Sequence, residues 1–373
     1  MRADNGPNEK SLTALRVAFL YFGVLMGAGF ASGKEMWQFF GVFGFMGFFG
    51  LLVIGVLFVV LGLMIVYIGN GLGTGDLSRI IFPYEHPLCE RTIGIIVAAF
   101  LFMAYFAMLA AGGALIESQF GIPRMAGSTL LMFLIVLTTV KGFGTVSARL
   151  GKVVPILLVA TLIMAFVILF GEFGSIEGKP SADASPLAPN WMIAAFVFVS
   201  YNMMGAIPIL GSCTVYAEDL RVVKRGAAMG GSFLGGCALV LYLVTLTDPL
   251  LSSVSDLPML AFAQRLSPVA GVLYSIVLLI SVFGTATSCF YGYCTKLPEN
   301  HIKTLIVWVS ALAGLIVSMM GFSNIVAFIY PLQGYLSLVF LALMIWNFIR
   351  IKKGRRQTVE FNSLTSSIDK KNK

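Results

Sequence analysis

Charged residues are scarce in this sequence. Only 11% of the 373 residues are charged, whereas soluble globular domains carry about 25%. Apolar residues make up 58% of the chain, and the mean hydropathy is +0.92. A soluble domain is therefore excluded. The composition predicts an all-α polytopic membrane protein, whose surroundings are the lipid bilayer.

Cysteine and histidine are also rare. Two histidines, His86 and His301, are predicted in loops, apart from the cysteines. The sequence contains no zinc-ligand spacing, no Ser-His-Asp set and no phosphate loop, so it predicts neither an enzyme nor a resident cofactor. The cysteines form no C-x-x-C pair and are interpreted as small apolar residues: Cys89, Cys213, Cys237, Cys289 and Cys294.

Long apolar runs account for most of the chain. A span needs roughly 20 apolar residues, and ten segments qualify. Residues 249–267 are less apolar and are predicted as an outside loop with a short interfacial helix around Leu257–Leu266. The predicted spans are 12–44, 47–69, 92–119, 124–141, 150–171, 190–217, 227–247, 268–295, 303–321 and 324–350.

The basic residues indicate the orientation in the membrane. With the N-terminus in the cytoplasm, all lysines and arginines but four fall on the cytoplasmic side, as the positive-inside rule requires. Both termini are therefore predicted to be cytoplasmic in a multi-pass protein of the cell membrane. The net charge of +8 belongs to short loops and the tail, so it does not indicate nucleic acid. The four exceptions are Lys34, Arg124, Lys179 and Arg265.

Two of the predicted spans contain residues that interrupt helices. The stretch Val24–Glu35 has three glycines within seven residues, and each weakens a helix by about 1 kcal/mol relative to alanine. In the span 190–217, Pro208 cannot donate a backbone hydrogen bond, and Gly205 and Gly211 lie nearby. Both helices are predicted to be broken. Such breaks in a membrane usually line a substrate or ion site of a transporter.

The ten spans divide into two halves of five, each beginning with a broken helix. An odd number of spans per half places the second half upside down, which predicts a 5+5 inverted repeat. The predicted parts are a cytoplasmic N-terminus (1–11), the first repeat (12–171), an extracellular loop (172–189), the second repeat (190–350) and a disordered basic cytoplasmic tail (351–373).

The sequence G-A-G-F-A-S-G-K-E of Gly27–Glu35, followed by Trp37-Gln38-Phe39-Phe40, resembles the opening motif of the YkvI-type bacterial membrane proteins. That family is similar to the amino acid-polyamine-organocation superfamily, which has the LeuT-type fold. The resemblance covers roughly residues 12–350. It implies secondary transport of an amino acid or similar amine, driven by sodium or protons. The alternative is a ligand-sensing receptor of the same fold, as in spore germination. Transport is favoured because no partner-docking segment is evident.

The first break carries most of the predicted substrate site. Ser32 and Glu35 have the S-x-x-E spacing of a capping box, in which the Ser32 hydroxyl accepts the Glu35 amide. The amides of Ala31, Ser32 and Gly33 would then bind a substrate carboxylate. Glu35 either caps only, or also binds an amine or carries a proton. Lys34 would pair with Glu35 or extend outward. The alternative use of the glycines is close helix packing.

Other candidates come from later spans. The resemblance implies that the third helix places an aromatic residue against the substrate, which indicates Tyr105, with core packing as the alternative. Ser200, Tyr201 and Asn202 flank the second predicted break, and the Asn202 amide needs a partner in substrate, ion or backbone. The predicted substrate-binding residues are Gly27, Ala28, Gly29, Ala31, Ser32, Gly33, Glu35, Tyr105, Ser200, Tyr201, Asn202 and Gly205.

A sodium site is predicted from oxygen atoms of two helices. The Thr287 and Ser288 hydroxyls and the Gly284 carbonyl share a helix face, and the carbonyls of Gly23 and Met26 add two oxygens. This set resembles the sodium site of LeuT-type symporters. The alternative is that the hydroxyls bond back to carbonyls one turn earlier. In proton-driven relatives a lysine replaces the ion, and Lys152 could play that role. Its place near the start of the fifth span also fits the positive-inside pattern, and that interpretation is favoured.

Overall fold

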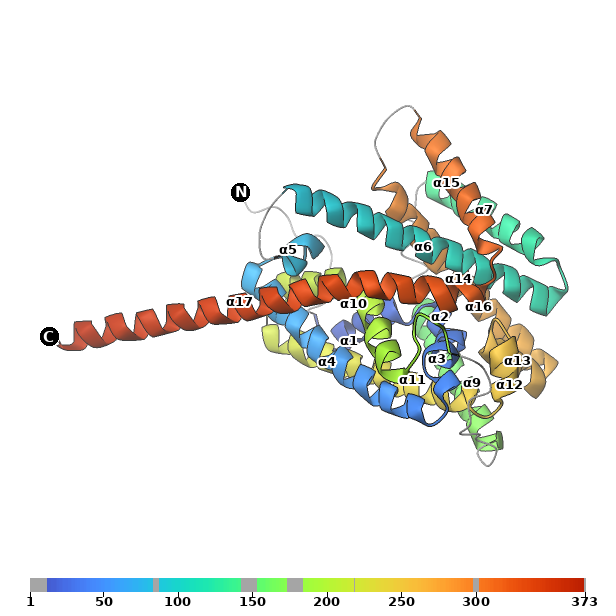
Figure 1. The fold of residues 1–373 in the computed structure, drawn as a ribbon, viewed down its shortest axis with the longest axis horizontal. Coiled ribbons are helices and arrows are strands. Elements are labelled where there is room, and N and C mark those ends of the chain that lie inside the picture. Colours follow the sequence, from blue (N-terminus) through green and yellow to red (C-terminus); the bar gives the residue numbers. More distant parts are fainter. Residues whose placement is uncertain are drawn as a thin grey trace.

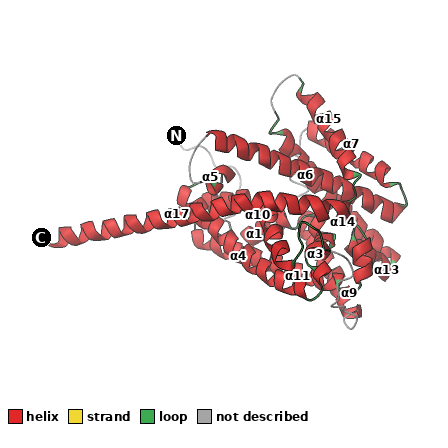
Figure 2. Cartoon of the chain, viewed as in Figure 1, coloured by secondary structure: helices red, strands yellow, loops and turns green. Residues whose placement is uncertain are grey.

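The computed structural model describes residues 12–82, 87–141, 153–172, 184–217, 219–297 and 302–371. Every regular element in these ranges is helical (Figure 2). The elements are α1 (Ala14–Leu25), α2 (Ala28–Ala31), α3 (Lys34–Phe39), η1 (Gly41–Phe43), α4 (Met46–Leu72), α5 (Leu77–Ile81), α6 (Pro87–Phe120), α7 (Arg124–Lys141), α9 (Val153–Glu172), α10 (Trp191–Tyr216), α11 (Leu220–Thr245), α12 (Pro249–Val254), α13 (Pro258–Leu266), α14 (Pro268–Cys294), α15 (Lys303–Ser318), α16 (Phe322–Asn324), η3 (Ile325–Ile329) and α17 (Tyr330–Lys371).

Six helices in the described ranges are long and apolar enough to cross a membrane: Met46–Leu72, Arg91–Phe120, Trp191–Tyr216, Leu220–Thr245, Pro268–Cys294 and Phe322–Gly354. Shorter apolar helices occupy Ala14–Leu25, Arg124–Val140, Ile156–Gly171 and Lys303–Ser318. Each of these helices coincides with one of the predicted spans. The predicted interfacial helix is also present, as α13. The prediction of an all-helical membrane-spanning architecture is therefore supported.

The predicted break in the second half is wrong. Helix α10 runs without interruption from Trp191 to Tyr216, with Pro208 inside it. A proline removes a single backbone donor, and α10 packs on α4, α17 and α1 along its length. Tertiary packing therefore keeps the helix continuous where local propensity alone favours a break.

The last described helix continues into the segment predicted as a disordered tail. Helix α17 ends at Lys371, and Figure 1 shows this end of α17 projecting away from the helical bundle. The disorder of residues 351–373 stays a prediction.

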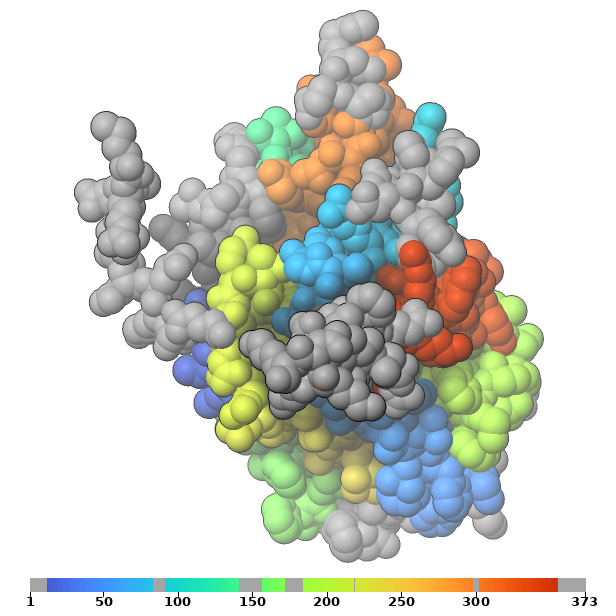
Figure 3. Space-filling model, turned by 90° about the vertical axis from the view of Figure 1, so that its left-hand side faces the viewer, coloured from blue at the N-terminus to red at the C-terminus, as the bar shows by residue number. Residues whose placement is uncertain are grey.

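The two halves of the chain share one core. Helix α4 of the first half packs on α10 and α11 of the second, α1 packs on the same two helices, and α6 packs on α14. The short helices α12 and α13 lie beside α3 and α14 at one side of the bundle (Figure 1). At the end viewed in Figure 3, the start of α15 lies beside the end of α7. The first predicted span consists of α1, α2 and α3 and is called helix 1 below. Helices from both halves of the chain thereby enclose it.

The contact between α4 and α11 gives a test of this packing. A Cβ on Gly231 would lie 2.8 Å from the Val59 nitrogen and 2.9 Å from its Cα, which are backbone atoms that cannot move aside. Gly236 on the same helix has no atom within 4 Å of such a Cβ. We expect Gly231→Ala to destabilise the protein by about 1–3 kcal/mol. Gly236→Ala should be neutral, or stabilising by up to about 1 kcal/mol. Thermal unfolding in detergent measures both, and equal melting temperatures would contradict the packing.

Candidate functional site

Helix 1 is interrupted inside the glycine-rich stretch. Helix α1 ends at Leu25, Met26 has φ −77° and ψ 65°, and Gly27 is extended with φ −80° and ψ −179°. Helix α2 then begins at Ala28. The first amides of a helix have no intrahelical partner. Within the described chain, the amides of Ala28, Gly29 and Phe30 make no hydrogen bond. The interruption thus leaves three backbone donors unused inside the bundle.

A second interruption separates α2 from α3. Gly33 has φ +80°, a left-handed conformation that residues with a Cβ rarely adopt. Its missing side chain also leaves room for Met259 of α13, whose Cγ would be 2.9 Å from a Cβ there. The Met259 amide donates to the Ser32 carbonyl at 2.9 Å. Helix α13 is therefore hydrogen-bonded directly to the interrupted part of helix 1, residues Met26–Glu35, which is called the hinge below.

The predicted capping box is absent. The Ser32 hydroxyl donates to the Gly29 carbonyl at 2.6 Å and accepts the Lys34 amide at 3.2 Å. The N-cap of α3 is Gly33, and the Glu35 carboxylate accepts a hydrogen bond from another helix. The capping prediction fails because the helix restarts at Ala28, a full turn before the S-x-x-E sequence.

The amides predicted to bind a substrate carboxylate are also engaged. Those of Ala31, Ser32 and Gly33 donate to backbone carbonyls within the turn of α2, at distances between 2.9 and 3.1 Å. The prediction that these three amides are free is therefore wrong. The unused donors lie three residues earlier.

Glu35 is the acidic residue of the hinge. Its side chain is buried, with the residue 5% exposed, and the Tyr201 hydroxyl of α10 donates to its Oε2 at 2.8 Å. A Cβ on Gly29 would overlap Glu35 Oε1 and would lie 3.6 Å from the Tyr330 hydroxyl. Glu35, Gly29, Tyr201 and Tyr330 therefore meet at one point. They come from α3, α2, α10 and α17.

Aromatic rings form one wall beside this carboxylate. The Phe39 ring lies 5.3 Å from Phe198 and 5.9 Å from Tyr201, and the Tyr201 ring lies 5.3 Å from Tyr330. Trp37, like Phe39, is 1% exposed. These aromatics face the interior and not lipid. Electron-rich ring faces of this kind attract cations.

Lys34 points away from Glu35. Its buried ammonium donates to the carbonyls of Ser252, Ser253 and Ser255 at 3.3, 2.9 and 2.8 Å. These carbonyls lie at the C-terminus of α12, the negative end of its helix dipole. The Lys34–Glu35 pair considered from the sequence is therefore not formed.

The remaining predicted substrate residues have mostly structural contacts. Tyr105 belongs to α6 and contacts α14 and α15. Its ring lies 4.3 Å from the Phe290 ring, and its hydroxyl lies 3.4 Å from the Ala311 carbonyl. The Ser200 hydroxyl donates to the Gly334 carbonyl of α17 at 2.7 Å. The Asn202 amide donates to the Phe198 carbonyl one turn earlier, at 2.9 Å.

Gly205 lies beside the end of α1, where a Cβ would be 3.7 Å from Leu25 Cδ2. Tyr201 is thus the α10 candidate that reaches the hinge carboxylate.

The predicted sodium ligands on α14 follow the alternative left open by the sequence. The Thr287 hydroxyl donates to the Phe283 carbonyl at 2.7 Å, and the Ser288 hydroxyl donates to Gly284 at 2.8 Å. Thr287 is buried, whereas Ser288 is exposed. Donation uses the hydroxyl hydrogens and leaves oxygen lone pairs. Lys152, the alternative cation, lies outside the described residues.

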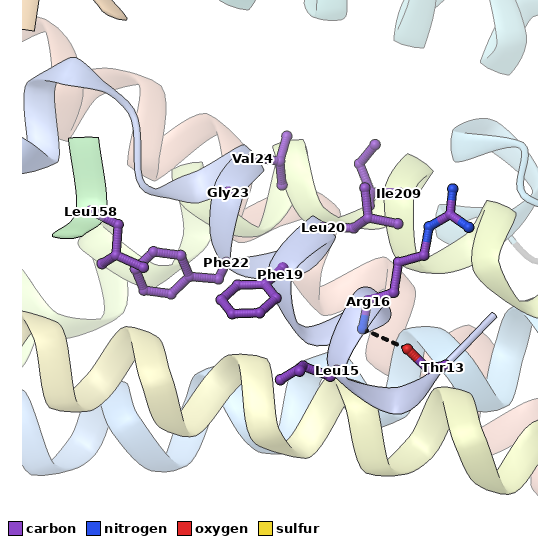
Figure 4. A pocket seen from close by; sticks show the side chains of 10 residues that line it. All are labelled: Thr13, Leu15, Arg16, Phe19, Leu20, Phe22, Gly23, Val24, Leu158 and Ile209. Atoms are coloured by element: carbon purple, nitrogen blue, oxygen red, sulfur yellow. Dashed lines mark hydrogen bonds between the residues drawn. The ribbon is translucent and has the colours of Figure 1, made fainter. Parts of the chain in front are cut away.

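A cavity of about 530 Å³ runs along α1 toward the hinge. Its wall includes Gly23 near the end of α1, Leu158 of α9 and Ile209 of α10. Figure 4 shows the α1 side chains lining this space, with Arg16 and Thr13 at the far end. The cavity connects the start of α1, which the sequence assigns to the cytoplasmic side, with the last turn before the break.

Sequence reasoning missed Tyr330. It follows the π-helix η3, Ile325–Ile329, and such bulges often occur at functional sites. The available signal was Pro331, directly after Tyr330, which indicates an irregular helix start inside the run 324–350.

No protein-family model matches the chain. The chain is 29% identical over 339 residues to the uncharacterized membrane protein YkvI of Bacillus subtilis (strain 168), covering 89% of this chain and 95% of YkvI. It is 27% identical over 337 residues to YyaD of the same organism, with 87% and 94% covered. The predicted resemblance to YkvI-type proteins is confirmed.

Solved structures of LeuT-type transporters have a similar fold. The inward-facing structure of Mhp1 matches with a TM-score of 0.61 at 15% identity, over 93% of this chain and 79% of Mhp1. MhsT in complex with L-phenylalanine matches with a TM-score of 0.55 at 17% identity, over 91% and 89%. Together with its membrane-protein relatives and apolar helices, this fold shows a multi-pass membrane protein.

Two glycines at the hinge provide a matched test of the site. A Cβ on Gly29 would force the Glu35 carboxylate to move, whereas a Cβ on Gly27 has no atom within 4 Å. We expect Gly29→Ala to lower solute affinity roughly tenfold, the loss of about 1.4 kcal/mol, in a folded protein. Gly27→Ala should fold equally well, since its φ of −80° suits alanine. Thermal-shift titration with amino acids measures both properties. Unchanged affinity in folded Gly29→Ala would exclude this contact from the site.

Proposed function

We propose that this chain is a secondary active transporter that carries a small zwitterionic solute, an amino acid or related amine, by alternating access. In this proposal, ten spans form a 5+5 inverted repeat of the LeuT type. The fold shared with Mhp1 and MhsT supports the transporter class. MhsT was solved with L-phenylalanine, which is a zwitterion of the proposed class.

The observation that carries the proposal is the buried Glu35 carboxylate at the broken helix. A charge at membrane depth costs on the order of 2.5–3.5 kcal/mol on insertion scales, so its retention requires a compensating role. One hydrogen bond, from Tyr201, reaches it, and within the described chain it forms no ion pair. A solute ammonium beside Glu35 would supply the missing positive charge.

The other end of a zwitterion would meet the hinge backbone. The unused amides of Ala28, Gly29 and Phe30 are oriented as donors at the start of α2, and Gly29 is already in contact with Glu35. An α-amino acid has its ammonium and carboxylate on one carbon. The closeness of Gly29 to the Glu35 carboxylate supports a site in which this acceptor and these donors bind the two groups.

The cavity along α1 supports a route between this site and the cytoplasm. It reaches Gly23, close to the Met26–Gly27 interruption, and it is lined mostly by apolar side chains from α1. A solute that leaves the hinge on this side would pass between α1, α9 and α10. These helices therefore form the proposed cytoplasmic pathway.

The coupling ion in this proposal is sodium or a proton. The Thr287 and Ser288 hydroxyl oxygens can accept a cation while donating their hydrogens backward. Carbonyls of Gly23 and Met26, at the end of α1, would complete a sodium site. Glu35 is the proposed carrier if protons drive transport.

Uptake by reconstituted protein tests the function. Proteoliposomes with wild-type protein should accumulate a labelled amino acid under an imposed sodium or pH gradient. Glu35→Gln should reduce affinity roughly 10- to 100-fold, because hydrogen bonds to charged groups contribute about 1.5–3 kcal/mol. Tyr201→Phe should weaken it less. Tyr335→Phe is the control, since Tyr335 bonds the Leu187 carbonyl elsewhere. Binding without uptake would instead indicate a receptor.

The sodium site has its own test. Thr287→Ala combined with Ser288→Ala should abolish stabilisation of the purified protein by sodium while leaving expression and sodium-free melting nearly unchanged. The hydroxyls donate only within their own helix, so their loss removes none of the described hydrogen bonds between helices. Melting is measured in sodium and in potassium buffers. Sodium-dependent stabilisation that persists in the double variant would eliminate these ligands.

A further inference from the structure

A second cavity, with a more polar wall, lies apart from the hinge. It is bounded by the ends of α7 and α14 and by the start of α15. Its volume is about 350 Å³. The sequence assigns this end of the bundle to the cytoplasm, and Figure 3 views the molecule from that end. The cavity contains none of the hinge residues. Its wall consists of Thr139, Val140, Tyr291, Cys294, Thr295, Lys303, Thr304 and Val307.

One hydroxyl in this wall lacks a partner. Thr139 is 9% exposed, and its buried Oγ1 has no hydrogen-bond partner among the residues that the structure describes. Its neighbour Thr138 bonds back to the Leu134 carbonyl at 2.7 Å, which is the usual solution for a threonine in a span. An unpaired buried hydroxyl costs roughly as much as a lost hydrogen bond. Such a group indicates a ligand that completes it.

The same wall is electropositive. Lys303 begins α15, and its side chain lines the cavity together with Cys294. The N-cap of α15 is Ile302, which provides no side-chain cap. The first amides of this 16-residue helix therefore point out of its N-terminus without an intrahelical partner, at the positive end of the dipole. An ammonium, helix amides and hydroxyls together suit an anion with several oxygens, such as a phosphate.

The surroundings of the cavity favour a lipid as the source of that phosphate. Leu137 and Val140 on α7 are exposed, as are Leu305 and Val309 on α15. These side chains continue from the polar cavity along the two helices toward the membrane centre. A polar pocket beside exposed apolar side chains matches a phospholipid, with its headgroup in the pocket and an acyl chain along these side chains.

We propose that this cavity binds the phosphate group of an anionic phospholipid headgroup in the cytoplasmic leaflet. Thr139 and Thr304 contact the phosphate oxygens, and Lys303 with the start of α15 supplies positive charge. The site is independent of the transport proposal, because it shares no residue with the hinge or with the cavity along α1.

The test is binding of dioctanoyl phosphatidylglycerol to purified, delipidated full-length protein, followed by native mass spectrometry and by melting temperature. Lys303→Gln and Thr139→Val should each weaken binding roughly tenfold or more. Lys303→Arg should retain binding, because the charge is kept. The matched controls are Lys296→Gln and Thr138→Val, which lie next to the cavity without lining it. Both controls should bind like the wild type.

Thr139→Val separates a ligand site from a structural role. Removing an unpaired buried hydroxyl should leave the lipid-free melting temperature unchanged or higher, while lipid affinity falls. Wild-type affinity in Lys303→Gln, or equal losses in the controls, would overturn the proposal. Inorganic phosphate and dioctanoyl phosphatidylcholine are the comparison ligands. Tight binding of inorganic phosphate alone, with displacement of the lipid, would overturn the lipid as the source and leave a free phosphate.

Discussion

The structure depends on one constraint, which is that the backbone groups released by a broken helix must be satisfied inside the membrane. Partners for the hinge come from distant segments. The Tyr274 hydroxyl of α14 donates to the Ala31 carbonyl at 2.8 Å, and the Met259 amide of α13 donates to the Ser32 carbonyl at 2.9 Å. Residues 249–267, predicted as an outside loop with a short interfacial helix, therefore support the hinge directly. The three amides at Ala28–Phe30 have no partner among the described residues.

The adjacent residues Lys34 and Glu35 contact different parts of the bundle. The Lys34 ammonium donates hydrogen bonds to three carbonyls at the C-terminus of α12. Had it paired with Glu35, the carboxylate would be neutralised within its own helix. Instead Glu35 is turned toward α10 and α17, with a tyrosine hydroxyl as its partner. The contact of this loop with Lys34 thus leaves the Glu35 carboxylate without an ion-pair partner among the described residues.

Local chemistry predicted the interruption of helix 1, because glycine weakens a helix at its own position. The same reasoning failed at Pro208, where packing of α10 against three helices outweighs one lost hydrogen bond. The capping box failed because its spacing does not reveal at which turn the helix restarts. Tyr201 could be found from its place near a suspected break. For Tyr330 the sequence offers only Pro331 as a sign of an irregular helix start, and its contact with the hinge arises from the fold.

The interruption also divides helix 1 into parts with different attachments. Helix α3 is fixed through Lys34 to α12, whereas α1 packs on α10 and α11 and lines a cavity of about 530 Å³. The non-helical residues Met26 and Gly27 form the connection between them, and no atom of the described residues lies within 4 Å of a Cβ built on Gly27. A change of angle there would move α1 against the cavity while Glu35 stays in place. A solute held by Glu35 and by the amides of α2 would contact the fixed part and the start of the movable connection at once, which is the geometry by which binding can bias the position of α1.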